Sequence, residues 1–228
     1  MLTSFGRPIH AVVIGASGGI GAALADQLAV DPGVKLVTRF SRPALDLEDP
    51  ASIAAAAASL SMPPDLVICA TGLLHAAGAR PERALKELEA GWLARNFAVN
   101  AIGPALVAQA FLPLMPREGR SVFAALSARV GSISDNGIGG WHGYRASKAA
   151  LNQIMRGAAI ELARTHKHAV CVALHPGTVA TPFTAEYVGR HAVVAPQVAA
   201  GHLLGVIDGL GPVQSGGFYD WAGAEVPW

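Results

Sequence analysis

The fold is decided by the stretch IHAVVIGASGGIG, residues 9–21. It starts with an apolar run that has the length of a buried strand, and an Ala- and Leu-rich segment typical of a helix follows the glycines. Glycines in a turn between a strand and a helix let the backbone approach a pyrophosphate, whose charge is met by the helix N-terminus. We therefore expect the residues of this turn to bind a dinucleotide: Gly15, Ser17, Gly18, Gly19, Ile20 and Gly21.

The same alternation of apolar runs and Ala-rich helical runs continues along the chain, as in βα units on a parallel sheet. The apolar runs are nearly continuous, which is typical of strands covered by helices on both faces. Strands are predicted at Ile9–Ile14, Val34–Arg39, Leu66–Ala70, Ser121–Ser127, Ala169–His175 and Gly217–Asp220. Helices are predicted at Gly19–Ala29, Pro50–Leu60, Ala84–Pro113 with a break, Gly143–Thr165 and Pro196–Gly209. The pattern predicts one α/β domain over residues 1–228, with a Rossmann-type, doubly wound parallel sheet of six to seven strands.

Composition argues against several classes of protein. Charged residues make up 14% of the chain and the net charge is +1, with Lys and Arg scattered, which does not suit an electrostatic nucleic-acid binder. The longest apolar helical stretch, Ala101–Met115, is too short to span a bilayer. Cys69 and Cys171 fall in predicted buried strands, where they read as core residues and not as disulfide or metal ligands. We expect a cytoplasmic protein with no nucleic-acid, membrane or metal partner.

A second informative stretch is YRASK, residues 144–148. Tyr144 and Lys148 are four residues apart at the start of a predicted helix, so both side chains share one helix face. A phenol has a pKa near about 10 and becomes an effective acid or base at neutral pH only if a cation stabilises the phenolate. Lys148 can supply that cation. This spacing is also common by chance, and the glycine turn is what favours the catalytic interpretation.

Taken together, the motifs resemble the short-chain dehydrogenase/reductase family. The resemblance covers essentially the whole chain, and the ordered motifs make a chance match improbable. The matches are Gly15, Gly19 and Gly21 to the glycine loop, Asn100 to the helix Asn, Tyr144 and Lys148 to the catalytic pair, and residues 175–181 (HPGTVAT) to the Pro-Gly-x-Val-x-Thr segment. Residues 131–141 and the ending at 217–228 resemble the C-factor-like branch of the family.

The resemblance implies an enzyme that moves a hydride between a nicotinamide and a small carbonyl compound or its alcohol. Tyr144 would be the general acid or base, and Lys148 would lower the pKa of Tyr144 and bond the nicotinamide ribose. Asn100 would hold a water that links Lys148 to solvent, and Thr181 would bind the carboxamide. The further cofactor contacts implied are Ala70, Thr71, Gly72, Pro176, Gly177 and Val179.

The choice between NAD and NADP is made at the end of the second strand, where an acid binds the ribose or an Arg accepts the 2′-phosphate. The segment 38–42 reads TRFSR and has no carboxylate. We therefore expect NADP(H), with Arg39 or Arg42 as the phosphate contact and NAD as the alternative. Asp46 and Leu47 resemble the pair that lies beside the adenine, although Asp46 can also act as a cap.

The sequence departs from the family pattern in the position of the catalytic Ser. Aligning residues 127–131 with the usual Ser-Ser-x-x-Gly places Ala128 where the Ser belongs. Ser132, twelve residues before Tyr144, fits the spacing to the Tyr, whereas Ser127 fits the strand end. We keep both and favour Ser132 slightly.

A second departure is the short segment between Arg39 and Asp46, which cannot hold the helix and strand usually found there. We expect that helix to be deleted and the adjoining strand to be vestigial. The function implied is an NADP(H)-dependent oxidoreductase that forms a homodimer or homotetramer, with a short, partly apolar substrate lid over residues 182–195. The alternatives are a non-catalytic nucleotide sensor or signalling protein, and an enzyme for epimerisation or dehydration.

Overall fold

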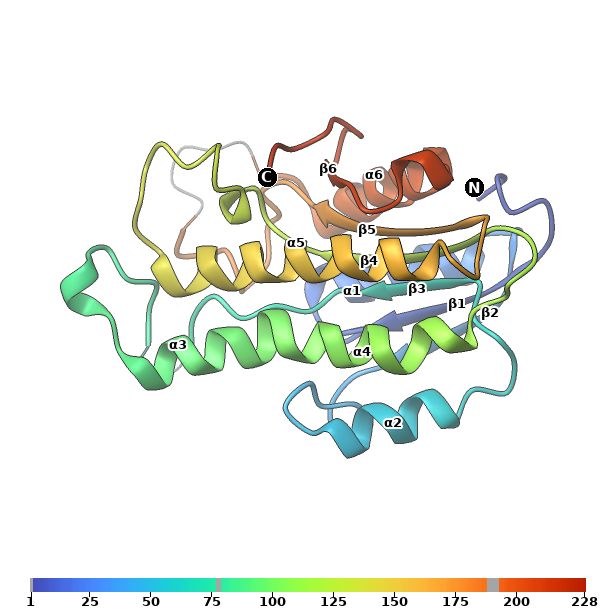
Figure 1. Cartoon of the computed structure of the whole chain (residues 1–228), viewed down its shortest axis with the longest axis horizontal. Helices are drawn as coiled ribbons and strands as arrows, with labels where there is room; N and C mark the ends of the chain where they lie inside the picture. The colour runs from blue at the N-terminus through green and yellow to red at the C-terminus, as the bar shows by residue number, and fades with distance from the viewer. Residues whose placement is uncertain (1, 77–78, 188–192) are drawn as a thin grey trace.

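The computed structural model describes residues 2–76, 79–187 and 193–228, and these form one parallel sheet with helices on both faces (Figure 1). The strand order is β2-β1-β3-β4-β5-β6, and every neighbouring pair is parallel. The strands are β1 (Ile9–Ile14), β2 (Val34–Phe40), β3 (Leu66–Cys69), β4 (Ser121–Leu126), β5 (Ala169–His175) and β6 (Phe218–Asp220). The main helices are α1 (Gly19–Val30), α2 (Pro50–Ala58), α3 (Ala90–Phe97), α4 (Gly103–Phe111), α5 (His142–Leu162) and α6 (Pro196–Gly209). The predicted Rossmann-type fold is confirmed.

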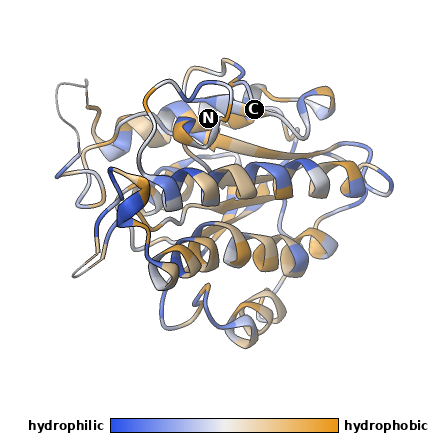
Figure 2. Cartoon of the chain, turned by 60° about the vertical axis from the view of Figure 1, so that its left-hand side comes forward, coloured by the Kyte–Doolittle hydropathy of each residue, from blue (hydrophilic) through white to orange (hydrophobic). Residues whose placement is uncertain are grey.

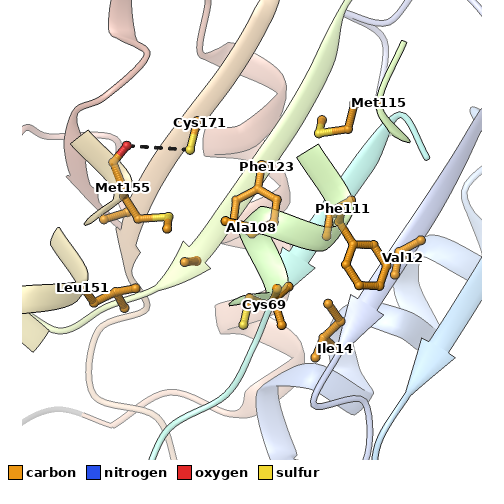
Figure 3. Close-up of a cluster of buried hydrophobic side chains, with 14 of the residues drawn as sticks. Val12, Ile14, Cys69, Ala108, Phe111, Met115, Phe123, Leu151, Met155 and Cys171 are labelled. Carbon is orange, nitrogen blue, oxygen red and sulfur yellow. Dashed lines mark hydrogen bonds between the residues drawn. The ribbon is translucent and has the colours of Figure 1, made fainter. Parts of the chain in front are cut away.

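Two apolar cores lie on the two faces of the sheet, because successive strand side chains point to opposite faces. Val12 and Ile14 of β1 pack with Phe111 of α4 and Leu151 of α5, whereas Val13 belongs to the core under α1 and α6. Figure 3 shows the first core, in which Phe111 lies against Val12. In Figure 2 hydrophobic and hydrophilic residues alternate along the helices, as expected for helices with one buried face.

The two cysteines are buried and free, as predicted. Cys171 Sγ lies 3.8 Å from the Met155 carbonyl oxygen within the core shown in Figure 3. Cys69 ends β3 in the same core. Both thiols therefore serve as small core side chains.

The predicted deletion after the second strand is present in the structure. Residues 41–49 connect β2 to α2 with turns and contain neither helix nor strand. Asp49 caps α2 by accepting a hydrogen bond from the Ala51 amide, and Pro50 occupies the first turn. The sheet therefore ends at β2, and the site beside it is bordered by a loop.

The predicted helix Ala84–Pro113 is broken before Ala90, where Leu88 and Glu89 are extended, and a π-helical turn, Ala98–Ile102, joins α3 to α4. The turn keeps α3 and α4 in one continuous helix, Ala90–Leu114, and by length and composition this is the one helix of the described residues that could cross a membrane. The expectation from Ala101–Met115 alone was wrong about the helix length, because the helix already begins at Ala90 and continues through the π turn. Its buried side chains pack on the sheet beside α5, as those of a core helix do.

Candidate active site

The glycine turn holds the end of β1 close to the end of β3. Gly15 has φ +84°, and a Cβ on it would lie 2.7 Å from the Ala70 carbonyl oxygen. A Cβ on Gly21 would lie only 2.1 Å from the Gly15 carbonyl oxygen, so α1 packs on the turn with no room for a side chain. The first turn of α1 begins at Gly19 with Gly18 as its N-cap, and no side chain covers the free amides there. Such a helix start is suited to a phosphate group.

A cleft of about 270 Å³ opens at the carboxyl ends of β1, β2 and β3. Parallel α/β sheets bind ligands at this edge. Its walls come from the glycine turn, the loop after β2, the segment after β3 and the long helix: Ile14, Gly15, Ser17, Gly18, Ser41, Arg42, Leu45, Asp46, Leu47, Glu48, Ala70, Thr71, Gly72, Leu73, Arg95 and Val99. The close backbone approach, the open helix start and the two arginines, Arg42 and Arg95, fit the phosphate and adenosine end of a dinucleotide.

The two arginines proposed for the 2′-phosphate differ in their surroundings. Arg39 donates to the Asp26 carboxylate at 2.7 Å and to the Ala25 carbonyl at 3.1 Å, and it is not part of the cleft wall. Arg42 lines the cleft beside Ser41. The structure therefore favours Arg42, since Arg39 is already engaged with α1.

Asp46 and Leu47 line the cleft as well, whereas the cap of α2 is Asp49 and not Asp46. The Asp46 carboxylate accepts a hydrogen bond from the Glu48 amide at 3.0 Å, which is a local turn contact. Leu47 packs on the long helix, where a Cβ on Gly103 would lie 2.6 Å from it.

Asn100 lies in the π turn and is fully buried. Its amide oxygen accepts from the Leu73 amide at 2.7 Å, and its Nδ2 donates to the Leu73 carbonyl at 2.8 Å and to Ser147 Oγ at 3.1 Å. Asn100 thus links Leu73 in the cleft wall to Ser147 of α5, the residue before Lys148. π turns are frequent at functional sites because they re-aim a side chain.

Tyr144 and Lys148 share one buried face of α5, with the Lys148 Nζ 5.9 Å from the Tyr144 ring centroid. Nζ donates a 2.7 Å hydrogen bond to the Leu126 carbonyl at the end of β4. Burial lowers the pKa of Lys148 to about 8, an effect that the nearby Cys69 thiol partly offsets.

The expected lowering of the Tyr144 pKa is not seen in the structure. Burial raises the pKa of Tyr144 above its usual value of 10.0. The physical reason is that the low-polarity surroundings penalise the phenolate, while the ammonium of Lys148 is directed at a carbonyl. In the protein alone Tyr144 is therefore a firmly protonated phenol.

Both candidate serines are buried near Lys148. Ser127 follows β4 and donates to Asn152 Oδ1 at 2.6 Å. Ser132 Oγ accepts from the Asp135 amide at 3.1 Å. The neighbouring Gly131 packs on α5, because a Cβ there would lie 2.8 Å from Lys148 Cβ. Neither hydroxyl is singled out by these contacts, so the choice stays a prediction.

The segment after β5 reaches back to the glycine turn. A Cβ on Gly19 would lie 2.6 Å from Thr181 Cγ2, so the two candidate cofactor segments touch. Gly177 has φ +78° and packs on Trp221, while Val179 is buried and pairs with Val194. Pro176 immediately precedes Gly177. Of the proposed lid, residues 188–192 lie outside the described residues.

The group that caps the start of α5 has no signature in the local sequence. Glu82 is 3% exposed, and its Oε2 accepts a hydrogen bond from the Gly143 amide at 3.1 Å. It therefore caps α5 from a segment about sixty residues earlier, where Trp141, the N-cap residue, provides no side-chain bond. His75, which follows β3, lies against Phe183 and Tyr187.

The comparisons with known proteins identify the family. The family described as enoyl-(acyl carrier protein) reductase matches residues 22–207. Together with the fold, the ordered motifs and dehydrogenase relatives, this shows that the chain belongs to the short-chain dehydrogenase/reductase family, whose members are NAD(P)-dependent oxidoreductases.

Particular relatives support the finer placement. The chain is 39% identical to C-signal of Myxococcus xanthus over 145 residues, which are 64% of this chain and 84% of that protein. It is 34% identical to 1-hydroxy-2-glutathionyl-2-methyl-3-butene dehydrogenase of Rhodococcus sp. (strain AD45) over 187 residues, 82% of this chain and 79% of that one. The similarity to C-signal agrees with the C-factor-like branch.

Among solved structures, the chain resembles NADPH-bound carbonyl reductase from chicken fatty liver, with a TM-score of 0.85, 26% identity and coverage of 97% of this chain and 95% of that one. It also resembles a short-chain dehydrogenase/reductase of Burkholderia multivorans with bound NADP, with a TM-score of 0.78, 26% identity and coverage of 97% and 100%.

Proposed function

We propose that the protein is an NADPH-dependent reductase that converts a small carbonyl compound to its alcohol. The observation that carries the proposal is the connection between the cleft and the catalytic pair. Leu73 in the cleft wall is bonded to Asn100, which is bonded to Ser147, the residue before Lys148. The buried phenol of Tyr144 and the buried amine of Lys148 thus lie on a helix that Asn100 connects to the wall of a cleft that fits a dinucleotide.

Residues of the cleft would hold the cofactor. The uncapped first turn of α1, which begins at Gly19, and the hydroxyl of Ser17 suit the pyrophosphate, and Arg42 suits a 2′-phosphate. The two similar solved structures hold NADPH or NADP, which supports the phosphorylated cofactor for this chain. When bound, NADPH supplies a hydride to the carbonyl carbon and becomes NADP⁺.

Tyr144 holds the proton that the carbonyl oxygen needs. Because burial raises its pKa, the phenol stays protonated over the neutral range and acts as a general acid. Lys148, with a pKa of about 8, lies next to it and can return the proton to Tyr144 after transfer. Ser132 or Ser127 would donate a hydrogen bond to the same oxygen, where negative charge develops.

The test is reduction of a panel of aldehydes and ketones, measured by the loss of NADPH absorbance. Tyr144→Phe should lower kcat at least about a hundredfold, the scale of a lost general acid, while NADPH affinity stays nearly unchanged. Tyr219→Phe is the matched control, since the Tyr219 hydroxyl bonds the Gln214 carbonyl beside β6. A fully active Tyr144→Phe variant, or no turnover of any carbonyl by the wild type, would overturn the proposal.

Intact Asn100, Tyr144 and Lys148 favour this enzyme over the nucleotide sensor. The homodimer or homotetramer and the cytoplasmic location stay predictions, which sedimentation and cell fractionation test.

A further inference from the structure

Five aromatic side chains form a closed circuit of ring contacts around Tyr144. The centroid distances are 6.3 Å for Tyr144–Trp141, 5.4 Å for Trp141–Tyr187, 5.7 Å for Tyr187–His75, 6.4 Å for His75–Phe183 and 6.2 Å for Phe183–Tyr144. We call these five residues the ring cluster. All five distances lie in the range of favourable aromatic pairs.

The ring cluster is assembled from three separate parts of the chain. His75 follows β3, Trp141 and Tyr144 lie at the start of α5, and Phe183 and Tyr187 follow β5. Trp141 has φ +51°, a left-handed conformation that costs a non-glycine residue about 1–2 kcal/mol. Its amide donates to the Glu82 carbonyl, which holds it in that conformation. Backbone strain of this kind concentrates at ligand sites.

Two polar atoms of the ring cluster are buried and have no hydrogen-bond partner among the described residues: His75 Nε2 and Tyr187 Oη. They belong to neighbouring rings. Buried polar atoms are nearly always paired, and leaving one unpaired is unfavourable. Two such atoms on neighbouring rings, in the same cluster as the Tyr144 phenol, indicate a ligand that carries its own hydrogen-bonding oxygen.

Phe183 shows that an aromatic ring fits against the phenol. Its ring packs on Tyr144, and its edge lies 3.6 Å from the place a Cβ on Gly72 would take, at the end of the cleft. An incoming aromatic group can replace this contact with one of the same kind. A saturated group of equal size would bury similar area but would lose the ring-to-ring attraction.

We propose that the ring cluster is the substrate-recognition site and selects planar aromatic carbonyl compounds that carry a second hydrogen-bonding oxygen. The reacting carbonyl points to Tyr144, and the second oxygen bonds His75 and Tyr187. This inference rests on the proposed function, since it names the substrate class of the same site.

Two matched pairs of ligands test it by binding alone. The full-length protein is titrated in the presence of NADP⁺, which has no hydride to give, and heat or tryptophan fluorescence is followed. Acetophenone should bind about three- to tenfold more tightly than cyclohexyl methyl ketone, which has the same number of heavy atoms. 1-Phenyl-1,2-propanedione should bind about three- to tenfold more tightly than propiophenone, which lacks the second oxygen.

Variants of Tyr187 separate the two parts of the proposal. Tyr187→Phe keeps the ring and one of the two hydrogen-bonding groups, His75, so it should reduce only the preference for the second oxygen. Tyr187→Leu should reduce both that preference and the preference for acetophenone. Tyr219→Phe, a phenol outside the ring cluster, should leave both ratios unchanged.

Equal affinities within both pairs, or unchanged preferences in Tyr187→Leu, would overturn the inference. Its failure is distinguishable from that of the proposed function. If aliphatic carbonyls are reduced with NADPH but neither preference exists, the inference alone fails. If the preferences exist but no carbonyl is reduced, the reductase assignment fails and the ring cluster stands as a binding site.

Discussion

The cofactor cleft and the ring cluster lie next to each other but are built in different ways. The cleft is formed largely by backbone and turn residues at the ends of β1, β2 and β3, whose positions the sheet fixes. The ring cluster is formed by side chains from loops and a helix start. If the ring cluster binds the substrate as we propose, cofactor binding depends mainly on backbone packing, whereas substrate selection depends on side chains from loops and a helix start.

The largest effect is expected from adding a methyl group to the glycine turn. Gly21→Ala places a Cβ 2.1 Å from the Gly15 carbonyl oxygen, so backbone must move. We expect a loss of more than about 3 kcal/mol in the free energy of unfolding, comparable to severe overpacking, and no measurable NADPH binding. Urea unfolding and NADPH titration measure both effects.

Gly157→Ala is the matched control for that experiment, because nothing lies within 4 Å of its Cβ position on the exposed face of α5. It should stabilise the protein by about 0.5–1 kcal/mol, the ordinary gain of Ala over Gly in a helix. Similar effects at both positions would show that the turn is not tightly packed.

The next largest effect concerns the buried amine between the two regions. Lys148→Met should abolish activity yet stabilise the protein by about 1–3 kcal/mol at pH 7, since a desolvated charge is replaced by an apolar chain. The native pKa of about 8 lies below the ordinary 10.5. Between these values the unfolded chain binds more protons than the native one, so stability of the wild type rises with pH.

The difference between Lys148→Met and wild type should therefore be greatest below pH 8 and fade towards pH 10.5. Thermal unfolding at several pH values measures it. A constant difference across this range would show that Lys148 is not desolvated as the structure indicates.

A smaller effect is expected inside the cleft, at one of its few charged side chains. Arg42→Ala should weaken NADPH binding about tenfold, the worth of one charge-assisted phosphate contact, and leave NADH binding unchanged. Arg39→Ala should weaken neither by more than about twofold, because Arg39 is engaged by an exposed pair with Asp26. If Arg39→Ala weakened NADPH binding and Arg42→Ala did not, Arg39 would be the phosphate contact. Dissociation constants for both cofactors decide it.

The smallest effect belongs to the ring cluster. Phe183→Leu should lower the free energy of unfolding by less than about 1 kcal/mol, because Phe183 is only half-buried and lies in a loop. Chemical denaturation compared with Gly21→Ala tests the contrast directly. If Phe183→Leu destabilised the protein as much as Gly21→Ala, the ring cluster would be part of the folding core.

Much of the fold was predictable because strands covered on both faces are largely apolar, and all six predicted strands are present, with every end within one residue of the prediction. The glycine turn was predictable for a related reason. Only glycine fits where Gly15 and Gly21 meet other backbone atoms, so geometry dictates the residue type.

The rest of the site could not be predicted, because nothing in the local sequence records long-range contacts. Glu82 reaches the start of α5 from a distant segment, and His75 meets Tyr187 only after folding. The sign of the Tyr144 pKa shift was missed because the spacing to Lys148 says nothing of burial. Arg39 and Arg42 are equivalent candidates in the sequence, and only the structure places Asp26 beside Arg39.

The missing strand beyond β2 has a consequence for solubility. An edge strand presents unpaired amides and carbonyls to which another chain can add, and proteins guard such edges with charged side chains. β2 is only seven residues long and carries Lys35 and Arg39, the latter held over α1 by Asp26. We expect these two charged side chains to hinder pairing of the exposed edge with another chain, so replacing both with Val should lead to precipitation while the monomer fold persists.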